Sequence, residues 1–510
     1  MIRRSPLIAL VVLTAILAAC SSSGGQSSTT PPGQAVPGLS DLSTEPPALV
    51  IRGPGADDLS VNPQALAAGD FNGDGAADLL IGAPFGDGPE DGRQDTGEAY
   101  VLTGPFPDSG DLELPGDAAL TITGARPGDN LGFTVLAADL NGDGTDDLVV
   151  GAPGVTAGRD PRTDQGRVYV FFGKAGLSGS FDLAPGGANP DFVVTGAEGF
   201  SRVGHALAAG DVNGDGTADL VLGAPFAGRE PGTPPGSARK EAGEVYAVFG
   251  SPELRGELNI AFDEPDFTAS AEQHLGHFGA AVAAGDINGD GVDDVIAGSP
   301  QATVQGRGGA GAVYAFFGGD RLGGRRFIDR GQYDVRVSGA ETGDGLGLPL
   351  AAADIDGDGA DDLLAGAHTA DGPGGSRPAA GEAYILSGGR LPNEIDAAGI
   401  NRLIYAAGDS GLFPTTAVAI GSGSGATLLL SSALGPRERP GAGALYYLRP
   451  ESRAAAIDLA QPEGRAGLLG AAGGDRLGSA VVLLPDDGAA GSRIAIMASG
   501  AGEIYLLATP

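Results

Sequence analysis

The chain has 510 residues, a formal net charge of −35 at pH 7 and 42% hydrophobic residues. An acidic surface of this kind argues against nucleic acid and anionic lipid headgroups as partners. The 91 glycines and 36 prolines, set among regular apolar runs, indicate an all-β protein with many short strands and turns.

Residues 1–19 have the features of a secretion signal. Arg3 and Arg4 supply a positive start, and the apolar stretch 7–19 is too short to span a bilayer comfortably. This stretch ends in Leu17-Ala-Ala-Cys20, which resembles the lipobox of bacterial lipoproteins. The resemblance implies cleavage before Cys20 and acylation of that residue, and several acyl chains would anchor the protein firmly. An ordinary signal peptide that happens to end near a cysteine is the alternative.

Residues 20–47 are rich in Ser, Thr, Gly and Pro and poor in apolar side chains. We therefore expect a lipidated Cys20 and a flexible tether that holds the folded part away from a membrane. Cys20 is the only cysteine, so no intramolecular disulfide can stabilise the fold in an oxidising compartment. The expected location is the cell envelope, at the outer membrane or the cell surface.

Five copies of one acidic loop dominate the remainder, residues 48–510. We call them Asp loops 1 to 5; they are residues 70–78, 139–147, 211–219, 286–294 and 354–362. Each has Asp at position 1, Asn or Asp at 3, Asp at 5, Gly at 6 and Asp at 9. So many clustered carboxylates are unfavourable without a cation, and the all-oxygen ligands favour Ca²⁺ over Zn²⁺ or Cu²⁺. The Gly at position 6 permits a sharp turn around the ion.

The loops are not EF-hands, which need a Glu at position 12 and a following helix. Position 12 is apolar in every copy: Ile81, Val150, Leu222, Ala297 and Ala365. Each loop continues into a short apolar run, such as residues 78–84, which is typical of a buried strand. A solvated acidic turn and a Mg²⁺ site are the alternatives. Five copies in register argue against the first, and the number of protein ligands argues against the second.

The loops recur at a regular period. Their first residues are 69, 72, 75 and 68 residues apart, and a Gly-x-x-Tyr marker places seven of the ten tyrosines at one repeat position. Each unit contains four strand-like runs, in the second unit residues 133–138, 148–152, 167–172 and 192–195. Seven such units predict a seven-bladed β-propeller. A linear stack is the alternative, but it would need polar capping repeats.

The ends of residues 48–510 complement each other. The last unit stops after a third strand at 502–510, while residues 48–53 resemble a fourth strand such as 119–124. We therefore predict that the N-terminal strand completes the last blade and closes the ring, which removes two exposed edges.

One dipeptide motif and one tripeptide motif accompany the Asp loops. Phe278-Gly279 and Leu131-Gly132 precede inner strands, and Gly82-Ala-Pro84 and Gly151-Ala-Pro153 follow Asp loops. Together they resemble the FG-GAP repeat of the integrin α-subunit propeller and its bacterial relatives. The resemblance covers about residues 48–510 and implies a seven-bladed propeller with Ca²⁺ in the first inter-strand loop of several blades.

Carried onto this chain, the resemblance implies about five Ca²⁺ ions, each held by side chains at positions 1, 3, 5 and 9 and by the carbonyl at position 7. The implied ligands are Asp70, Asn72, Asp74, Ala76 and Asp78; Asp139, Asn141, Asp143, Thr145 and Asp147; Asp211, Asn213, Asp215, Thr217 and Asp219; Asp286, Asn288, Asp290, Val292 and Asp294; and Asp354, Asp356, Asp358, Ala360 and Asp362. Blades six and seven carry residues 421–427 and 485–493 in place of the loop, and we expect no Ca²⁺ there. Nothing resembles the inserted metal-binding domain of integrins.

The connections between the second and third strands vary most in length and carry charge. They are residues 85–96, 154–165, 226–242 and 369–380, on the face opposite the Asp loops. Variable polar loops on a rigid scaffold usually bind ligands, so we expect a binding or adhesion module for a protein or a glycan. The candidate contacts are Arg93, Arg159, Arg162, Arg229, Arg239 and Lys240. Solvated loops without a ligand are the alternative.

An enzyme is the weaker hypothesis. The chain has four histidines and no nucleophile elbow, phosphate-binding Gly-Lys loop or HExxH motif, so no catalytic residue is assigned. Some polysaccharide lyases use Ca²⁺-rich propellers, which keeps a lyase open as an alternative. A structural envelope component that binds only copies of itself is a third possibility.

The Asp loops predict that the fold depends on calcium. Extracellular Ca²⁺ modules have dissociation constants of roughly 10⁻⁴ to 10⁻³ M, so about 1 mM Ca²⁺ would add on the order of 0.4 to 1.4 kcal/mol per site. Five sites together approach the net stability of an ordinary domain. We expect a chelator to lower the melting temperature markedly in a calorimetric scan, and an unchanged scan would contradict this.

Overall fold

The computed structural model describes most of the chain from residue 39 onward. The described residues are 39–55, 58–59, 62–88, 92–156, 164–197, 201–228, 241–271, 276–400, 403–406, 413–420, 426–436, 439–448, 456–461, 467–485 and 492–509. The predicted signal peptide 1–19, Cys20 and residues 21–38 of the predicted tether lie outside them. In the described part of the chain, we find no helix of the length and apolarity that crossing a membrane requires.

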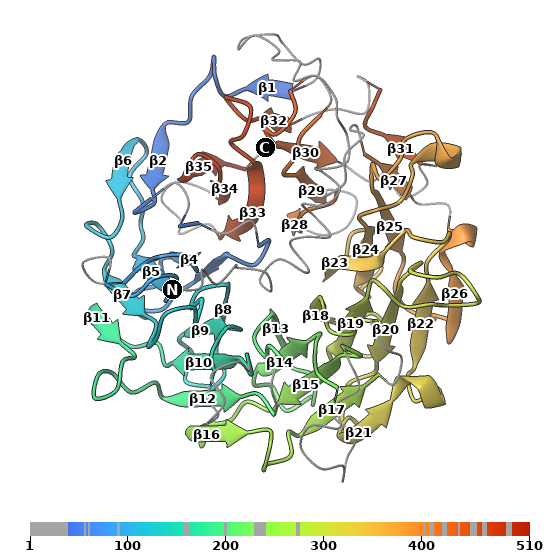
Figure 1. The fold of residues 1–510 in the computed structure, drawn as a ribbon, viewed down its shortest axis with the longest axis horizontal. Coiled ribbons are helices and arrows are strands. Elements are labelled where there is room, and N and C mark those ends of the chain that lie inside the picture. The colour runs from blue at the N-terminus through green and yellow to red at the C-terminus, as the bar shows by residue number, and fades with distance from the viewer. Residues whose placement is uncertain are drawn as a thin grey trace, which may run out of the picture.

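Seven sheets surround a central axis, as Figure 1 shows. Each sheet has five strands, which follow one another from the axis outward. In this order, blade 1 contains β3 (Leu66–Gly69), β4 (Asp78–Ala83), β5 (Glu98–Leu102), β7 (Leu120–Thr123) and β11 (Gly179–Asp182). Blade 2 contains β8 (Thr134–Ala138), β9 (Asp147–Ala152), β10 (Arg167–Phe171), β12 (Phe192–Thr195) and β16 (Gly256–Asn259). Blade 3 contains β13 (Ala206–Gly210), β14 (Asp219–Ala224), β15 (Glu244–Val248), β17 (Phe267–Ser270) and β21 (Gly324–Phe327).

The remaining four blades follow the same order. Blade 4 contains β18 (Val282–Gly285), β19 (Asp294–Ser299), β20 (Ala312–Phe316), β22 (Val335–Ser338) and β26 (Glu394–Asp396). Blade 5 contains β23 (Leu346–Ala353), β24 (Asp362–Ala367), β25 (Glu382–Leu386), β27 (Leu403–Tyr405) and β31 (Ile457–Asp458). Blade 6 contains β28 (Ala417–Ile420), β29 (Thr427–Ser432), β30 (Ala444–Leu448), β32 (Gly467–Leu469) and β1 (Leu39–Asp41). Blade 7 contains β33 (Leu477–Leu484), β34 (Arg493–Ala498), β35 (Glu503–Ala508), β2 (Leu49–Arg52) and β6 (Gly110–Glu113).

The prediction of a seven-bladed all-β propeller is confirmed. Among the described residues, helical structure is limited to three short 3-10 turns, η2 (Ile328–Arg330), η3 (Pro373–Gly375) and η4 (Ala397–Gly399). Within each blade, the first four strands pair antiparallel, as β3, β4, β5 and β7 do. The second strand of blades 1 to 6 is wholly buried, because neighbouring blades cover both of its faces.

The fifth strand of each blade was not predicted. In blade 1 it is β11, which comes from the third-to-fourth connection of blade 2 and pairs parallel with β7. Such strands are short and have few apolar residues, as the Gly179–Asp182 strand shows, so no alternation of apolar residues reveals them. They cover the outer edge of each blade, which would otherwise offer unpaired backbone groups to other chains.

The predicted closure of the ring is also confirmed. β2 pairs antiparallel with β35, with Val50 opposite Tyr505, and so serves as the fourth strand of blade 7. β1, within the segment expected to be a tether, adds a second closure, because it pairs parallel with β32 as the fifth strand of blade 6. The N-terminal segment thus belongs to two neighbouring blades.

A buried ion pair fastens β1. Arg439 donates two hydrogen bonds to Asp41, at 2.8 and 2.5 Å, and the two side chains are only 6% and 9% exposed. These bonds lower the pKa of Asp41 to about 2. Arginines in the corresponding loops of blades 1, 4 and 5 pair in the same way with the last residue of the fifth strand, in the pairs Arg93–Asp182, Arg307–Asp396 and Arg377–Asp458.

Breaking the Arg439–Asp41 ion pair should destabilise the ring. Arg439→Met leaves the Asp41 carboxylate buried without its cation, which typically costs about 3 to 5 kcal/mol. The control is Arg93→Met, because Asp182 is 42% exposed and the loss there should be about 1 kcal/mol or less. Denaturant unfolding measures both variants.

The same pair predicts a pH dependence. The pKa of Asp41 is lower in the folded chain than its ordinary 3.8, so the stability it contributes is present above about pH 4 and is lost as the pH falls toward 2. If Arg439→Met and Arg93→Met lowered the free energy of unfolding by the same amount, the role assigned to Arg439 would be contradicted.

Candidate metal centres and the central cavity

Asp loop 1 folds around the carboxylate of Asp70. This carboxylate accepts backbone N–H bonds from Gly73 at 2.7 Å, Asp74 at 3.1 Å and Gly75 at 2.8 Å. The turn requires glycine at positions 4 and 6, because Gly73 and Gly75 have φ angles of 73° and 85°. The Asp74 N–H also bonds to the side-chain oxygen of Asn72 at 2.9 Å, so the oxygens of positions 1 and 3 converge.

Asp loops 2, 3 and 4 repeat this geometry. Asp139, Asp211 and Asp286 each accept N–H bonds from the residues at positions 5 and 6 of their own loops. In all five loops the position-7 N–H donates to the carboxylate at position 5, at distances of 2.9 to 3.1 Å. Positions 1, 3, 5 and 7 are therefore held in one compact turn.

Asp loop 5 brings three carboxylates together. Carboxylate oxygens of Asp354, Asp356 and Asp358 lie within 4.8 Å of one another. Because Ca²⁺ binds oxygen at 2.3–2.6 Å, two oxygens on one ion can be at most about 5 Å apart. The donor set and its spacing in this loop thus fit a hard divalent cation.

The carboxylates at position 9 lie deeper and have backbone partners. Asp78 is fully buried and accepts N–H bonds from Phe71 at 3.1 Å and Gly104 at 2.9 Å. It thereby ties the Asp loop to the end of the third strand. Burial raises the pKa of Asp78 to about 6 and that of Asp147, Asp219 and Asp294 to about 7. In loops 1 to 4 the position-3 amide also donates to the position-9 carboxylate, at distances of 2.9 to 3.4 Å, so position 9 adjoins the turn formed by positions 1, 3, 5 and 7. Whether position 9 holds the ion stays a prediction.

The predicted ligand contacts are mostly outside the described residues. Arg159, Arg162, Arg229, Arg239 and Lys240 belong to that group. Arg93 is described, and its guanidinium donates to both carboxylate oxygens of Asp182 at 2.8 and 3.0 Å. Of the replaced loops in blades 6 and 7, residues 421–425 and 486–491 also lie outside, so the expected absence of Ca²⁺ there stays a prediction.

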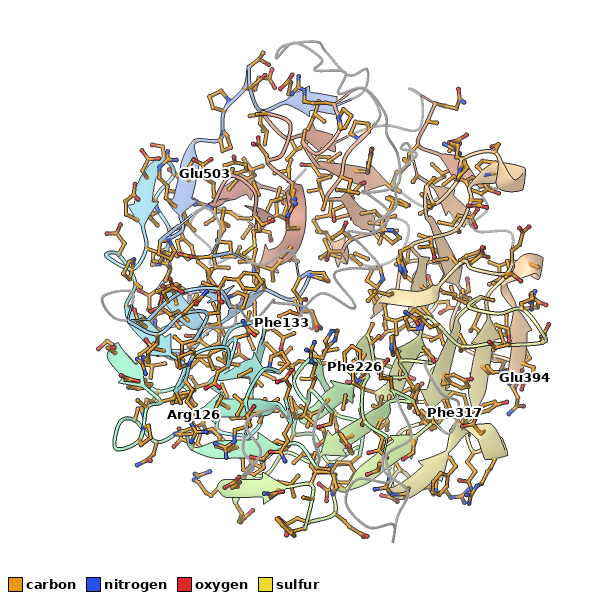
Figure 2. All side chains as sticks on the ribbon, in the orientation of Figure 1. Arg126, Phe133, Phe226, Phe317, Glu394 and Glu503 are labelled. Atoms are coloured by element: carbon orange, nitrogen blue, oxygen red, sulfur yellow. The ribbon has the colours of Figure 1, made fainter. Side chains whose placement is uncertain are left out.

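A cavity of about 710 Å³ occupies the propeller axis. Its walls are apolar residues of the inner strands, such as Leu66, Val135 and Val482, and it also borders the fourth-to-first and second-to-third connections. It therefore opens on the face opposite the Asp loops. Figure 2 shows Phe133 and Phe226 beside the central opening.

Aromatic and polar side chains gather at the mouth of this cavity. The ring of His205 lies 5.3 Å from that of Phe133 and 6.0 Å from that of Phe226, between centroids. Arg202 donates to Asp164 at 3.0 Å. Burial, with Arg202 nearby, lowers the pKa of His205 to about 3, so its ring is neutral.

Sequence reasoning missed this cluster. A weak signal exists, because the residue before the Leu-Gly, Phe-Gly or Val-Gly pair is polar in several blades. Asn130, Arg202, His277 and Arg476 occupy that position with φ between 54° and 55°. A positive φ at a non-glycine residue is uncommon and often marks a functional site.

Four segments match the model of the FG-GAP repeat, at residues 62–102, 131–171, 203–248 and 278–316. Each segment contains one Asp loop and the first three strands of a blade. Four of the seven blades thus match the FG-GAP repeat. This confirms the resemblance seen in the sequence, whereas the bacterial lipoprotein signal stays a prediction.

The similar proteins include phospholipases D and an integrin alpha chain. The phosphatidylinositol-glycan-specific phospholipases D of Rattus norvegicus and Homo sapiens are each 34% identical over 42% of this chain, which corresponds to 23% and 24% of those proteins. Integrin alpha pat-2 of Caenorhabditis briggsae is 32% identical over 46% of this chain and 17% of its own length. The chain thus spans a quarter or less of these relatives. Among solved structures, BBS1N in complex with ARL6DN aligns with 89% of this chain and 94% of its own, at a TM-score of 0.43 and 8% identity.

The buried carboxyl at position 9 generates a pH prediction for the chelated protein. The pKa of Asp147 is raised from 3.8 to about 7 in the folded chain. The stability of the wild type is therefore lost as the pH rises from about 4 to about 7. Asp147→Asn cannot ionise, so it should gain on the order of 2 kcal/mol relative to wild type between pH 5 and 8.

The comparison between the two proteins isolates Asp147, because every other titrating group, including His205, His277 and His368 with their lowered pKa values, is present in both. Denaturant unfolding in chelator measures the difference at each pH. A difference that does not change with pH would show that Asp147 is ionised in the folded chain throughout this range.

Proposed function

We propose that this chain is a calcium-stabilised, membrane-anchored binding module of the cell envelope that recognises a protein or a glycan. The observation that carries this proposal is the cavity of about 710 Å³ at the centre of one face, with aromatic, basic and acidic side chains at its mouth. Concave, mostly apolar sites with a few convergent polar groups are typical binding sites.

One face of the propeller would stabilise the fold and the other would bind the ligand. On one face, Ca²⁺ in the five Asp loops would neutralise the clustered carboxylates and stiffen the inner turns. On the other, the second-to-third connections and the cavity mouth would contact the ligand. Similarity to integrin alpha chains supports protein binding at a cell surface, and a lipid on Cys20 would supply the anchor.

The cavity favours binding over the lyase alternative. A lyase site would show a basic residue beside paired acids. Among the described residues that line the cavity, Asp164 is the one carboxylate, and it is already paired with Arg202. No specific observation favours the envelope component that binds only itself, and sedimentation of the purified chain would separate it from a monomeric binder.

The test is capture from native envelope by the immobilised full chain, with and without Ca²⁺, followed by binding of each isolated ligand. Phe133→Ala removes an aromatic ring at the cavity mouth and should weaken binding about tenfold or more, as truncation of an interface hot spot does. Phe262→Ala is the matched control, because Phe262 is 86% exposed and does not line the cavity. Equal binding by wild type and both variants would place the ligand elsewhere.

A further inference from the structure

Each of Asp loops 1 to 4 is bonded to the next blade around the ring. At each of the four junctions between consecutive loops, the backbone after the third strand of one blade bonds to the position-2 carbonyl of the preceding loop. The four donors and acceptors are Lys174 to Phe71, Ser251 to Leu140, Gly319 to Val212 and Gly389 to Ile287, at 2.8 to 2.9 Å. Each bond ties one Asp loop to the blade that carries the next one.

Three junctions have a second, reciprocal link through an aspartate at position 8. The N–H of Asp70 donates to the carboxylate of Asp146 at 2.9 Å, and the N–H of Asp146 donates to the carbonyl of Asp70 at 3.1 Å. Asp211 and Asp293 form the same pair of bonds between loops 3 and 4. Asp286 and Asp361 form it between loops 4 and 5.

A glycine makes room for each of these carboxylates. Gly69, Gly210 and Gly285 directly precede position 1 of loops 1, 3 and 4. A Cβ on any of them would lie only 2.5 to 2.7 Å from an oxygen of Asp146, Asp293 or Asp361. None of the three has a positive φ, so the glycine is required for space rather than for backbone conformation.

The junction between loops 2 and 3 lacks both partners of this arrangement. Ala138 replaces the glycine before Asp139, and Ala218 replaces the aspartate at position 8. Among the described residues, we find neither reciprocal bond between Asp139 and Ala218. Glycine and aspartate are thus present together at three junctions and absent together at the fourth.

We propose that Asp146, Asp293 and Asp361 are positioning residues that couple cation binding between neighbouring Asp loops, so that loops 1 and 2 form one cooperative unit and loops 3, 4 and 5 form another. The coupling rests on the proposed binding of Ca²⁺ in the Asp loops. The three residues do not hold the ion themselves; they join the backbone of one ligand residue to the neighbour of another.

The physical basis is shared ordering of the two turns. Position 1 supplies the carboxylate around which a loop folds. Its partner is position 8 of the next loop, which directly precedes the buried aspartate at position 9 of that same loop. A cation that orders the first turn fixes Asp70, and Asp70 fixes Asp146 through two bonds. The second turn is then already ordered when its cation arrives, which gives positive cooperativity. Coupling free energies between sites commonly correspond to about a tenfold change in affinity.

Calcium titration of the full chain by calorimetry tests the proposal. For a coupled pair of sites, a tenfold effect gives a Hill coefficient of about 1.5. The combined variant Asp146→Ala, Asp293→Ala and Asp361→Ala should retain five bound Ca²⁺ with a Hill coefficient near 1. The conservative variant Asp146→Asn keeps an acceptor oxygen and should keep cooperativity in the first unit, whereas Asp146→Ala should lose it.

A variant that gains cooperativity tests the proposal even if the alanine variants fail to fold. Ala138→Gly with Ala218→Asp installs both partners at the uncoupled junction and should raise the Hill coefficient above that of the wild type. Ala218→Asp alone should not, because the Cβ of Ala138 occupies the space. Ala77→Asp is the matched control, since it would face Pro485 of blade 7, which has no N–H to donate.

The outcomes separate the two proposals. Calcium binding with identical cooperativity in all variants would overturn the coupling and leave the calcium sites intact. The absence of any calcium binding would overturn both. Cooperativity that rises equally in the Ala77→Asp control would show that added charge, rather than the junction, is responsible.

Discussion

The fold depends on each blade being covered by its neighbours. The second strands, such as β4 and β9, are buried along their whole length, so no blade can shield its own apolar residues from water. A ring satisfies this requirement for every blade only when it closes. The N-terminal segment closes it twice, through β2 in blade 7 and β1 in blade 6, and the buried Arg439–Asp41 pair fastens the second contact.

Closure also explains the difference between the two faces. The Asp loops lie where the inner strands turn back, in close contact from blade to blade, and their carboxylates organise the turns through backbone N–H bonds. The opposite face carries longer and more variable connections around an apolar cavity. A rigid face that supports a variable face is the arrangement in which binding residues usually evolve.

The aspartates of the Asp loops have different structural roles. Position 1 organises the turn, position 9 ties the first hairpin to the third strand, and position 8 reaches the neighbouring loop. One short acidic motif therefore acts within a loop, within a blade and between blades. This explains why its carboxylates range from exposed groups in the turn to fully buried ones at the start of the second strand.

The sequence by itself determined the number of blades, four strands in each, the closing role of residues 48–53 and the place of the Asp loops, because apolar periodicity and repeated motifs are local signals. Only the tertiary structure decided the rest. The fifth strands are short and polar, so they acquire a partner only where another blade presents an edge. The link from Asp70 to Asp146 and the cluster of Phe133, Arg202 and His205 join residues from different repeats, which become neighbours only because the ring brings successive blades side by side.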